Sequence, residues 1–125
     1  MNTEAFIKAY NESRNGTNIF HFNPLYRKFL YSDGVRECAE AGCYWLLDIL
    51  GTELPGAFAK RPDAFLCIVT VTVKNESAKI VGEFDDDDEK PYRKSINYTD
   101  LPEGEWIFYV SNDDGKLHCI LPKEY

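Results

Sequence analysis

Residues 64–73 read AFLCIVTVTV, and this stretch decides the fold. It is rich in β-branched residues and follows a two-residue period, which is typical of a well-buried β-strand. Every later apolar stretch keeps that period, and turn residues such as NDDG separate the stretches. We therefore predict five strands in an antiparallel meander. The other four lie within AKIVGEF (78–84), PYRKSINY (91–98), EWIFYV (105–110) and KLHCIL (116–121).

The chain before this strand carries a helical pattern instead. SDGVRECAEAGCYWLLDIL (32–50) has apolar residues at intervals of three and four, begins with Ser32 or Asp33 as N-cap, and ends before Gly51. Gly42 in its apolar stripe suggests close approach of another backbone. Residues 3–13 predict a short N-terminal helix, and residues 15–31 are interpreted as turns and loop.

These elements predict one α+β domain over residues 1–125. In it, the main helix of about residues 32–50 and the short N-terminal helix pack on the five-stranded antiparallel meander. The predicted inward-facing sets are Phe65, Cys67, Val69 and Val71, then Trp106, Phe108 and Val110, then Leu117, Cys119 and Leu121.

Acidic residues are concentrated in the second half of the chain. The net charge is −7, and residues 64–125 contribute 13 acidic and 7 basic side chains to it, a net of −6. Such a surface repels phosphate backbones, so direct nucleic-acid binding is disfavoured. A partner protein with a basic surface is favoured instead.

The sequence offers little conventional chemistry. It contains no nucleophile elbow, phosphate-binding loop or metalloprotease motif, and its four cysteines form no CxxC pair. We expect the cysteines to be buried apolar residues and the protein to have no cofactor, no metal and no enzymatic activity. No apolar run is long enough to cross a bilayer and no export signal is recognisable, which predicts a cytoplasmic protein.

The acidic stretch EFDDDDEK (83–90) is the most unusual feature of the sequence. It does not match a calcium-binding loop, because Lys90 and Ile96 stand where that loop needs Gly and Glu. We interpret it first as a solvated hairpin tip whose charge acts in association rather than in folding. If it is a docking surface, the partner-binding residues are Asp85, Asp86, Asp87, Asp88 and Glu89, joined by Asp113 and Asp114 if both hairpin tips lie on one side.

A second candidate site uses residues of the first half. A hydrogen bond between His21 and Asp33 in a pocket would favour an enzyme or a ligand-binding domain, because a carboxylate beside an imidazole can orient a general base. The residues of this alternative pocket are His21, Tyr26, Arg27, Tyr31, Asp33, Tyr44, Trp45 and Asp48.

The order of short motifs resembles a family of small proteins of unknown function found in bacterial, plasmid and phage genomes. The resemblance covers residues 16–125 and implies a mobile-element setting without a known reaction. The motifs that carry it are GTN (16–18), YR (26–27), YSDGV (31–35), CYWLLD (43–48), YTDLP (98–102) and LPKEY (121–125).

Together these observations predict a non-enzymatic acidic binding protein of a mobile element. The specific hypothesis is a phage-encoded, anti-CRISPR-like inhibitor that binds a basic, nucleic-acid-binding surface of a protein in the bacterial host's cytoplasm. The alternatives are a small enzyme or ligand-binding domain that uses the second site, and a dimeric structural or regulatory module. Whether the protein is a monomer or a homodimer stays open.

Overall fold

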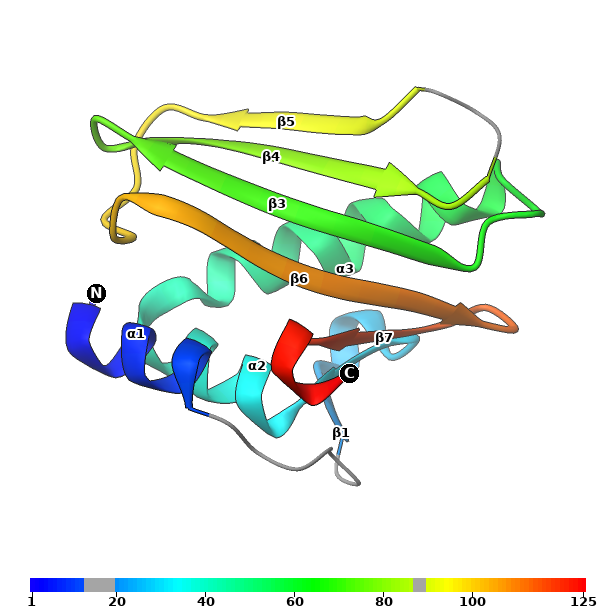
Figure 1. Ribbon diagram of the computed structural model, residues 1–125. Coiled ribbons are helices and arrows are strands. Elements are labelled where there is room, and N and C mark those ends of the chain that lie inside the picture. The colour runs from blue at the N-terminus through cyan, green and yellow to red at the C-terminus, as the bar shows by residue number, and fades with distance from the viewer. Residues whose placement is uncertain (13–19, 87–89) are drawn as a thin grey trace.

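A computed structural model describes residues 1–12, 20–86 and 90–125 of the chain. Its centre is a seven-stranded mixed sheet with the order β1-β2-β7-β6-β3-β4-β5 (Figure 1). The pair β2·β7 is parallel, and the other pairs are antiparallel. The strands are β1 (Phe20–Phe22), β2 (Phe29–Ser32), β3 (Leu66–Lys74), β4 (Ser77–Phe84), β5 (Tyr92–Ile96), β6 (Gly104–Asp113) and β7 (Lys116–Ile120).

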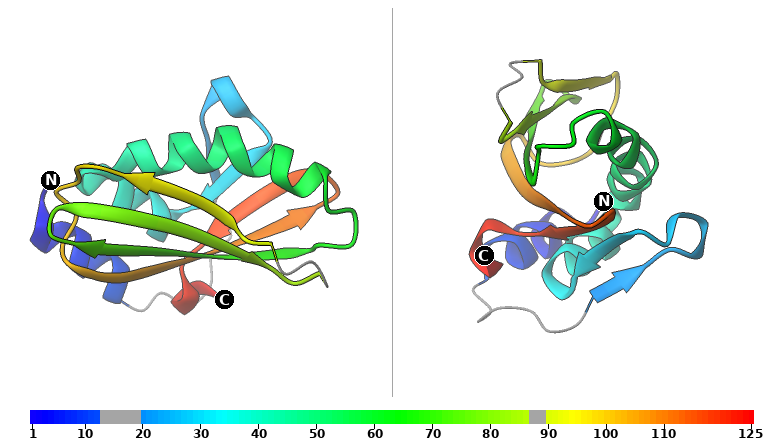
Figure 2. Two further views of the ribbon diagram at one scale, coloured as in Figure 1. Left: turned by 90° about the horizontal axis from the view of Figure 1, so that it is seen from above. Right: turned by 90° about the vertical axis from the view of Figure 1, so that its right-hand side faces the viewer.

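The helices cover one face of this sheet, as the two views in Figure 2 show. The longest, α3, runs behind β3 and β4, and α1 packs beside α2 under β6 through Phe6 and Tyr10, whose rings contact Trp106. The helical segments are α1 (Thr3–Asn11), η1 (Pro24–Tyr26), α2 (Asp33–Cys38), the π-helical turn η2 (Ala39–Cys43), α3 (Tyr44–Ala59) and η3 (Pro122–Glu124).

The prediction of a five-stranded antiparallel meander is wrong: the sheet has seven strands and one parallel pair, and only five of these strands follow residue 64 in the described part of the chain. β6 pairs with β3 and not with β5, so the chain passes over the β3–β4 hairpin before it re-enters the sheet. Two further strands, β1 and β2, lie in residues that were interpreted as turns and loop. They are short and depend on β7, whose Leu117 donates its backbone N–H to the carbonyl of Lys28. The α+β class is broadly right.

The predicted inward-facing residues are mostly right. Most of them are buried, as alternation along each strand requires: Cys67, Val69, Val71, Phe108, Val110, Leu117, Cys119 and Leu121. Trp106 is partly buried against α1, and its indole N–H donates to the carbonyl of Pro102. Phe65 is the exception: it precedes β3 and is 60% exposed.

The prediction of one helix over about residues 32–50 is wrong in its extent: the helix begins where predicted, but Gly42 divides it into α2 and α3, and α3 continues past the predicted end. Ser32 is the N-cap, and its hydroxyl accepts the backbone N–H of Val35. Gly51 lies within α3 and does not end it. The ring of Tyr26 packs onto this glycine, and an added Cβ would lie 2.5 Å from a ring carbon. A glycine in mid-helix is therefore required for this contact, and α3 continues to Ala59.

Gly42 marks an interruption between α2 and α3. Its φ of +133° is a conformation that favours glycine, and a Cβ there would lie 3.0 Å from the Cα of Met1. The close approach of another backbone that the sequence predicted is thus confirmed. The N-terminus is also tied down at this position, because Asn2 donates its backbone N–H to the carbonyl of Ala41.

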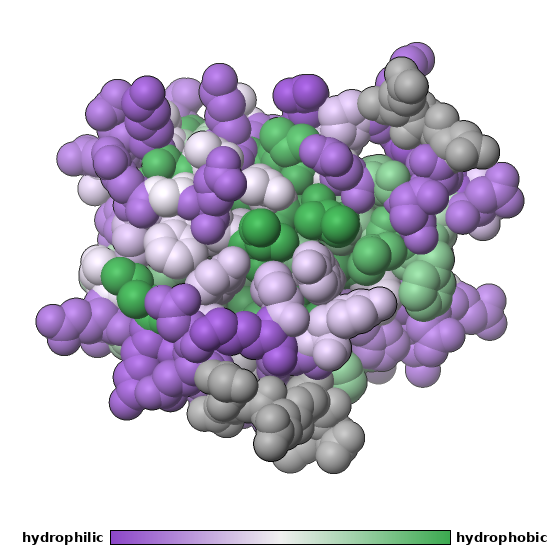
Figure 3. Space-filling view, in the orientation of Figure 1, coloured by the Kyte–Doolittle hydropathy of each residue, from purple (hydrophilic) through white to green (hydrophobic). Residues whose placement is uncertain are grey.

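The other face of the sheet is largely uncovered among the residues that the structure describes, with the short C-terminal η3 beside β7 at its edge (Figure 1). Figure 3 views the molecule from this side and shows apolar side chains gathered in the middle, with hydrophilic ones above and below. Ile68 of β3 lies opposite Tyr109 of β6, which lies opposite Ile120 of β7. We call this side the open face.

Candidate functional site

The first candidate site is the acidic stretch after β4. Asp85 does not simply face solvent, because its Oδ1 accepts the backbone N–H groups of Phe65 at 2.7 Å and Leu66 at 3.0 Å. These are the N–H groups at the start of β3. The Asp85 side chain therefore fixes the end of the β3–β4 pair.

Asp86 is bound still more closely. Its carboxylate lies 3.1 Å from a guanidinium nitrogen of Arg61, and both side chains are about nine-tenths buried. Arg61 lies at the end of α3, stacks over the Phe84 ring at 4.3 Å and donates to the carbonyl of Lys90. The interpretation of the acidic stretch as a solvated tip without a folding role is therefore wrong for Asp85 and Asp86.

The remaining predicted partner-binding residues divide into two groups. Asp87, Asp88 and Glu89 lie outside the described residues. Asp113 and Asp114 are exposed at the β6–β7 turn, at the same end of the sheet as Asp85 (Figure 1). That these carboxylates bind a partner stays a prediction.

The alternative pocket centres on a pair that the fold does bring together. His21 Nε2 and Asp33 Oδ1 are 2.6 Å apart, and each side chain is partly exposed. His21 lies on β1 opposite Tyr31 of β2, with the two ring centroids 5.9 Å apart. Asp33 is the first residue of α2, so the pair joins the edge strand of the sheet to the start of that helix.

A second pair anchors the turn between β1 and β2. The hydroxyl of Tyr26 donates to Asp48 Oδ1 on α3 at 2.5 Å. Burial, followed by this hydrogen bond, raises the pKa of Tyr26 to about 12. The phenol therefore stays protonated at neutral pH and acts as a fixed donor. Together with the contact at Gly51, this bond holds the turn against α3.

The other residues of the alternative pocket differ in exposure. Tyr31 is buried, and burial is the main cause that raises its pKa, followed by the neighbouring Tyr44. Tyr44 is 44% exposed, Trp45 is partly buried against the core, and Arg27 is exposed. The cluster thus combines a neutral phenol, a carboxylate–imidazole pair and an exposed aromatic ring, which is a set capable of hydrogen bonding and proton transfer.

Glu124 is a structural residue that the sequence analysis did not single out. Its side chain is buried and accepts hydrogen bonds from Ser32 Oγ at 2.5 Å, from the N–H of Leu121 at 2.9 Å and from the N–H of Gly34 at 3.3 Å. The YSDGV and LPKEY motifs thus meet in space. Their joint presence in the resemblance was the available signal.

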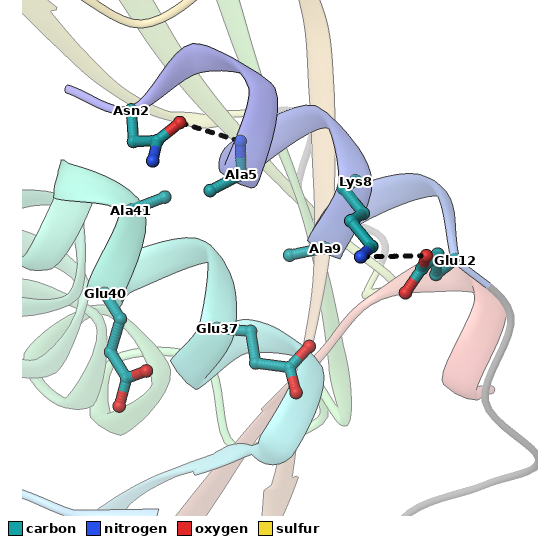
Figure 4. Close-up of a pocket in the computed structure, with 8 residues that line it drawn as sticks. All are labelled: Asn2, Ala5, Lys8, Ala9, Glu12, Glu37, Glu40 and Ala41. Atoms are coloured by element: carbon teal, nitrogen blue, oxygen red, sulfur yellow. Dashed lines mark hydrogen bonds and ion pairs between the residues drawn. The ribbon is translucent and has the colours of Figure 1, made fainter.

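A cavity of about 390 Å³ lies between α1 and the α2–η2 segment (Figure 4). Small side chains leave this space: Ala5 and Ala9 on one side and Ala41 on the other. Three of the charged groups at its margin are in ion pairs: Lys8 pairs with Glu12, and Glu40 pairs with Arg36. None of the predicted site residues lines it, and we assign it no function.

Metal binding and thiol chemistry have no structural support in the described part of the chain. There, no three His, Cys, Asp or Glu side chains are placed so that they could hold a metal ion. All four cysteines are free and buried, and burial raises their pKa values, which disfavours reactive thiolates. Within the same residues, no helix has both the length and the apolar character needed to cross a membrane.

Comparisons with known proteins give one match. Residues 7–125 match a family described as "Family of unknown function (DUF6876)". Neither the curated proteins nor the solved structures contain a match.

Proposed function

The chain belongs to the family DUF6876, whose function is unknown, and we propose that it is a non-enzymatic binding protein that docks on a basic surface of another protein. The observation that carries this proposal is the position of its exposed carboxylates. Asp113 and Asp114 lie at the same end of the sheet as Asp85, so these three carboxylates of the second half are grouped, whereas Glu76, Glu103 and Glu105 lie at the opposite end.

Charge gathered at one end favours association with an oppositely charged surface. It raises the rate of encounter with a basic partner and repels acidic ones. The internal roles of Asp85 and Asp86 are compatible with this, because their hydrogen bonds fix the backbone at the acidic end of the sheet. A preorganised surface loses less entropy on docking.

The acidic end also suggests a class of partner protein. Proteins that bind nucleic acid present basic grooves, and an acidic protein end can occupy such a groove. We therefore extend the proposal to a nucleic-acid-binding protein of a bacterial host defence system, with this chain as an inhibitor carried by a mobile element. The acidic charge and the motif resemblance to proteins of plasmid and phage genomes support this extension.

The test compares two variants that lose the same charge. Asp113→Asn with Asp114→Asn removes two carboxylates from the acidic end, and Asn tolerates the left-handed backbone of Asp114 (φ +50°). Glu4→Gln with Glu76→Gln removes two exposed carboxylates elsewhere. A partner captured from bacterial lysate by the wild type is then measured against each variant at low and high salt.

We expect the Asp113/Asp114 variant to associate several-fold more slowly at low salt and to lose much of the salt dependence, because electrostatic steering falls with charge. The Glu4/Glu76 control is expected to resemble the wild type. An acidic partner, or equal association rates for the two variants, would contradict the proposal.

The His21–Asp33 pair favours a second candidate function, a ligand-binding or acid–base site. Its 2.6 Å separation meets the geometric requirement for a carboxylate that orients an imidazole. A screen of small metabolites by thermal shift tests it, with Asp33→Asn as the site variant and Asp63→Asn, an exposed residue, as control. Stabilisation by a metabolite that only the Asp33 variant loses supports this candidate, and the absence of any stabilising metabolite counts against it.

A further inference from the structure

An apolar groove lies on the open face, at the acidic end of the sheet. Its volume is about 380 Å³, and Asp85 and Ser111 complete a lining that is otherwise apolar. The apolar lining comes from the start of β3, the middle of β6, the end of β7 and the C-terminal residue: Phe65, Leu66, Tyr109, Ile120 and Tyr125.

These side chains are exposed to an unusual degree for their size. Phe65 is 60% exposed and Tyr125 is 86% exposed, although the Tyr125 ring contacts the Tyr109 ring with a centroid separation of 5.6 Å. Ile68, which lies opposite Tyr109, is 40% exposed and extends the patch along β3. Contiguous apolar surface with a polar border marks an interaction site more often than does a scattered apolar residue (Figure 3).

The groups around the groove determine which occupant fits. Asp85 is part of its lining, Glu83 lies opposite Ile68 in the register, and Asp113 and Asp114 lie at the adjacent turn. Lys116 lies opposite Asp113 and offsets one of these charges, which leaves a negative border. A second copy of this chain would bring another net charge of −7 to the same place, which disfavours self-association.

We propose that this groove receives a large apolar side chain of the partner protein, flanked in the partner's sequence by Lys or Arg residues. The inference rests on the proposed function and adds the apolar half of the recognition. The two halves act at different steps: exposed charges at the border mainly change the association rate, whereas a buried apolar anchor mainly changes the dissociation rate.

The probe is a fluorescein-labelled peptide with the central residues Ile-Trp-Ile between two runs of three lysines. A control peptide replaces the apolar residues with serines and keeps the charge. The groove variant is Phe65→Ser with Tyr125→Ser, which changes exposed side chains and leaves the core intact. Its matched control is Leu25→Ser, an apolar residue of η1 that is 89% exposed and does not line the groove; its neighbour Tyr26 packs on α3, on the covered side of the sheet.

We expect the groove variant to bind the apolar peptide about tenfold more weakly than the wild type, through faster dissociation, since truncated anchors in a groove cost this much or more. Leu25→Ser should bind like the wild type, and the serine peptide should bind weakly to all proteins. The Asp113/Asp114 variant should instead associate more slowly.

Three results would overturn the inference, and they are distinguishable. If the groove variant binds as well as the wild type while the Asp113/Asp114 variant loses binding, recognition is electrostatic alone: the groove is not used, and the proposed function stands. If neither peptide binds the wild type, the groove inference and the basic-partner proposal both fail. If light scattering shows a dimer that the groove variant abolishes, the occupant is a second copy of the chain.

Discussion

Replacing Glu124 with Ala tests whether the C-terminal segment holds the fold together. The carboxyl group is buried and accepts three hydrogen bonds, two of them 2.9 Å or shorter. Truncation leaves the hydroxyl of Ser32 and the N–H of Leu121 without this acceptor, and each bond to a charged group contributes about 1.5–3 kcal/mol. The third bond, to Gly34, is long and adds little. We therefore expect the free energy of unfolding to fall by about 3–5 kcal/mol.

Urea unfolding, followed by tryptophan fluorescence and by circular dichroism, measures this loss. Thermal melting should show the same change as a decrease of roughly 10–20 °C, given the size of the domain. Glu124→Gln, which keeps the shape and one acceptor, should lie between the wild type and Glu124→Ala. Lys123→Ala changes the exposed neighbouring residue and should stay within about 0.5 kcal/mol of the wild type. A loss of less than about 1 kcal/mol for Glu124→Ala would refute the reasoning.

Two further predictions concern ion pairs. Asp86→Ala should destabilise the protein by about 2–4 kcal/mol, because it removes a closely paired, buried carboxylate from the guanidinium of Arg61; urea unfolding that matches the exposed control Asp113→Ala would contradict this. The hydrogen bond from Lys94 lowers the pKa of Glu53, so the Glu53–Lys94 pair stabilises the folded state at neutral pH. This contribution to the free energy of unfolding is lost as the pH falls through the lowered pKa. Since the pair is more than a third exposed, Glu53→Gln should cost at most about 1 kcal/mol at pH 7. Urea titrations at several pH values compare the free energy of unfolding of the wild type and of Glu53→Gln. The difference between the two should narrow towards about pH 3, and a difference that widens there would be inconsistent with the pKa shift.

The elements that sequence reasoning found are those that depend on local pattern. The five strands after residue 64 alternate clearly, and the helix after Ser32 has a cap and an apolar stripe. Sheet order depends instead on contacts between distant residues, which no local period encodes. β1 and β2 have 3 and 4 residues, too short for their alternation to be separated from loop, and they form because β7 offers a partner.

The same distinction explains the candidate sites. Asp113, Asp114 and Asp85 share one end of the sheet because the strand register places the β6–β7 turn at the end where β3 begins and β4 ends. That Asp86 pairs with Arg61, 25 residues away, required the end of α3 to return to the sheet. The continuation of α3 through Gly51 also could not be predicted, because the reason for that glycine is the ring of Tyr26, which reaches it from another element.

The parallel pairing of β2 with β7 has a consequence for biosynthesis. The first strands of the chain reach the rest of the sheet only through residues 116–120, and Ser32 bonds to a residue 92 positions later. A ribosome must therefore translate residues 116–124 before residues 20–32 can join the sheet. Closure over such a separation slows folding, and the waiting segment exposes the apolar side chains of FLY (29–31) meanwhile. Nascent chains stalled before residue 116 should accordingly engage chaperones, whereas the β3–β4 hairpin can already form in them.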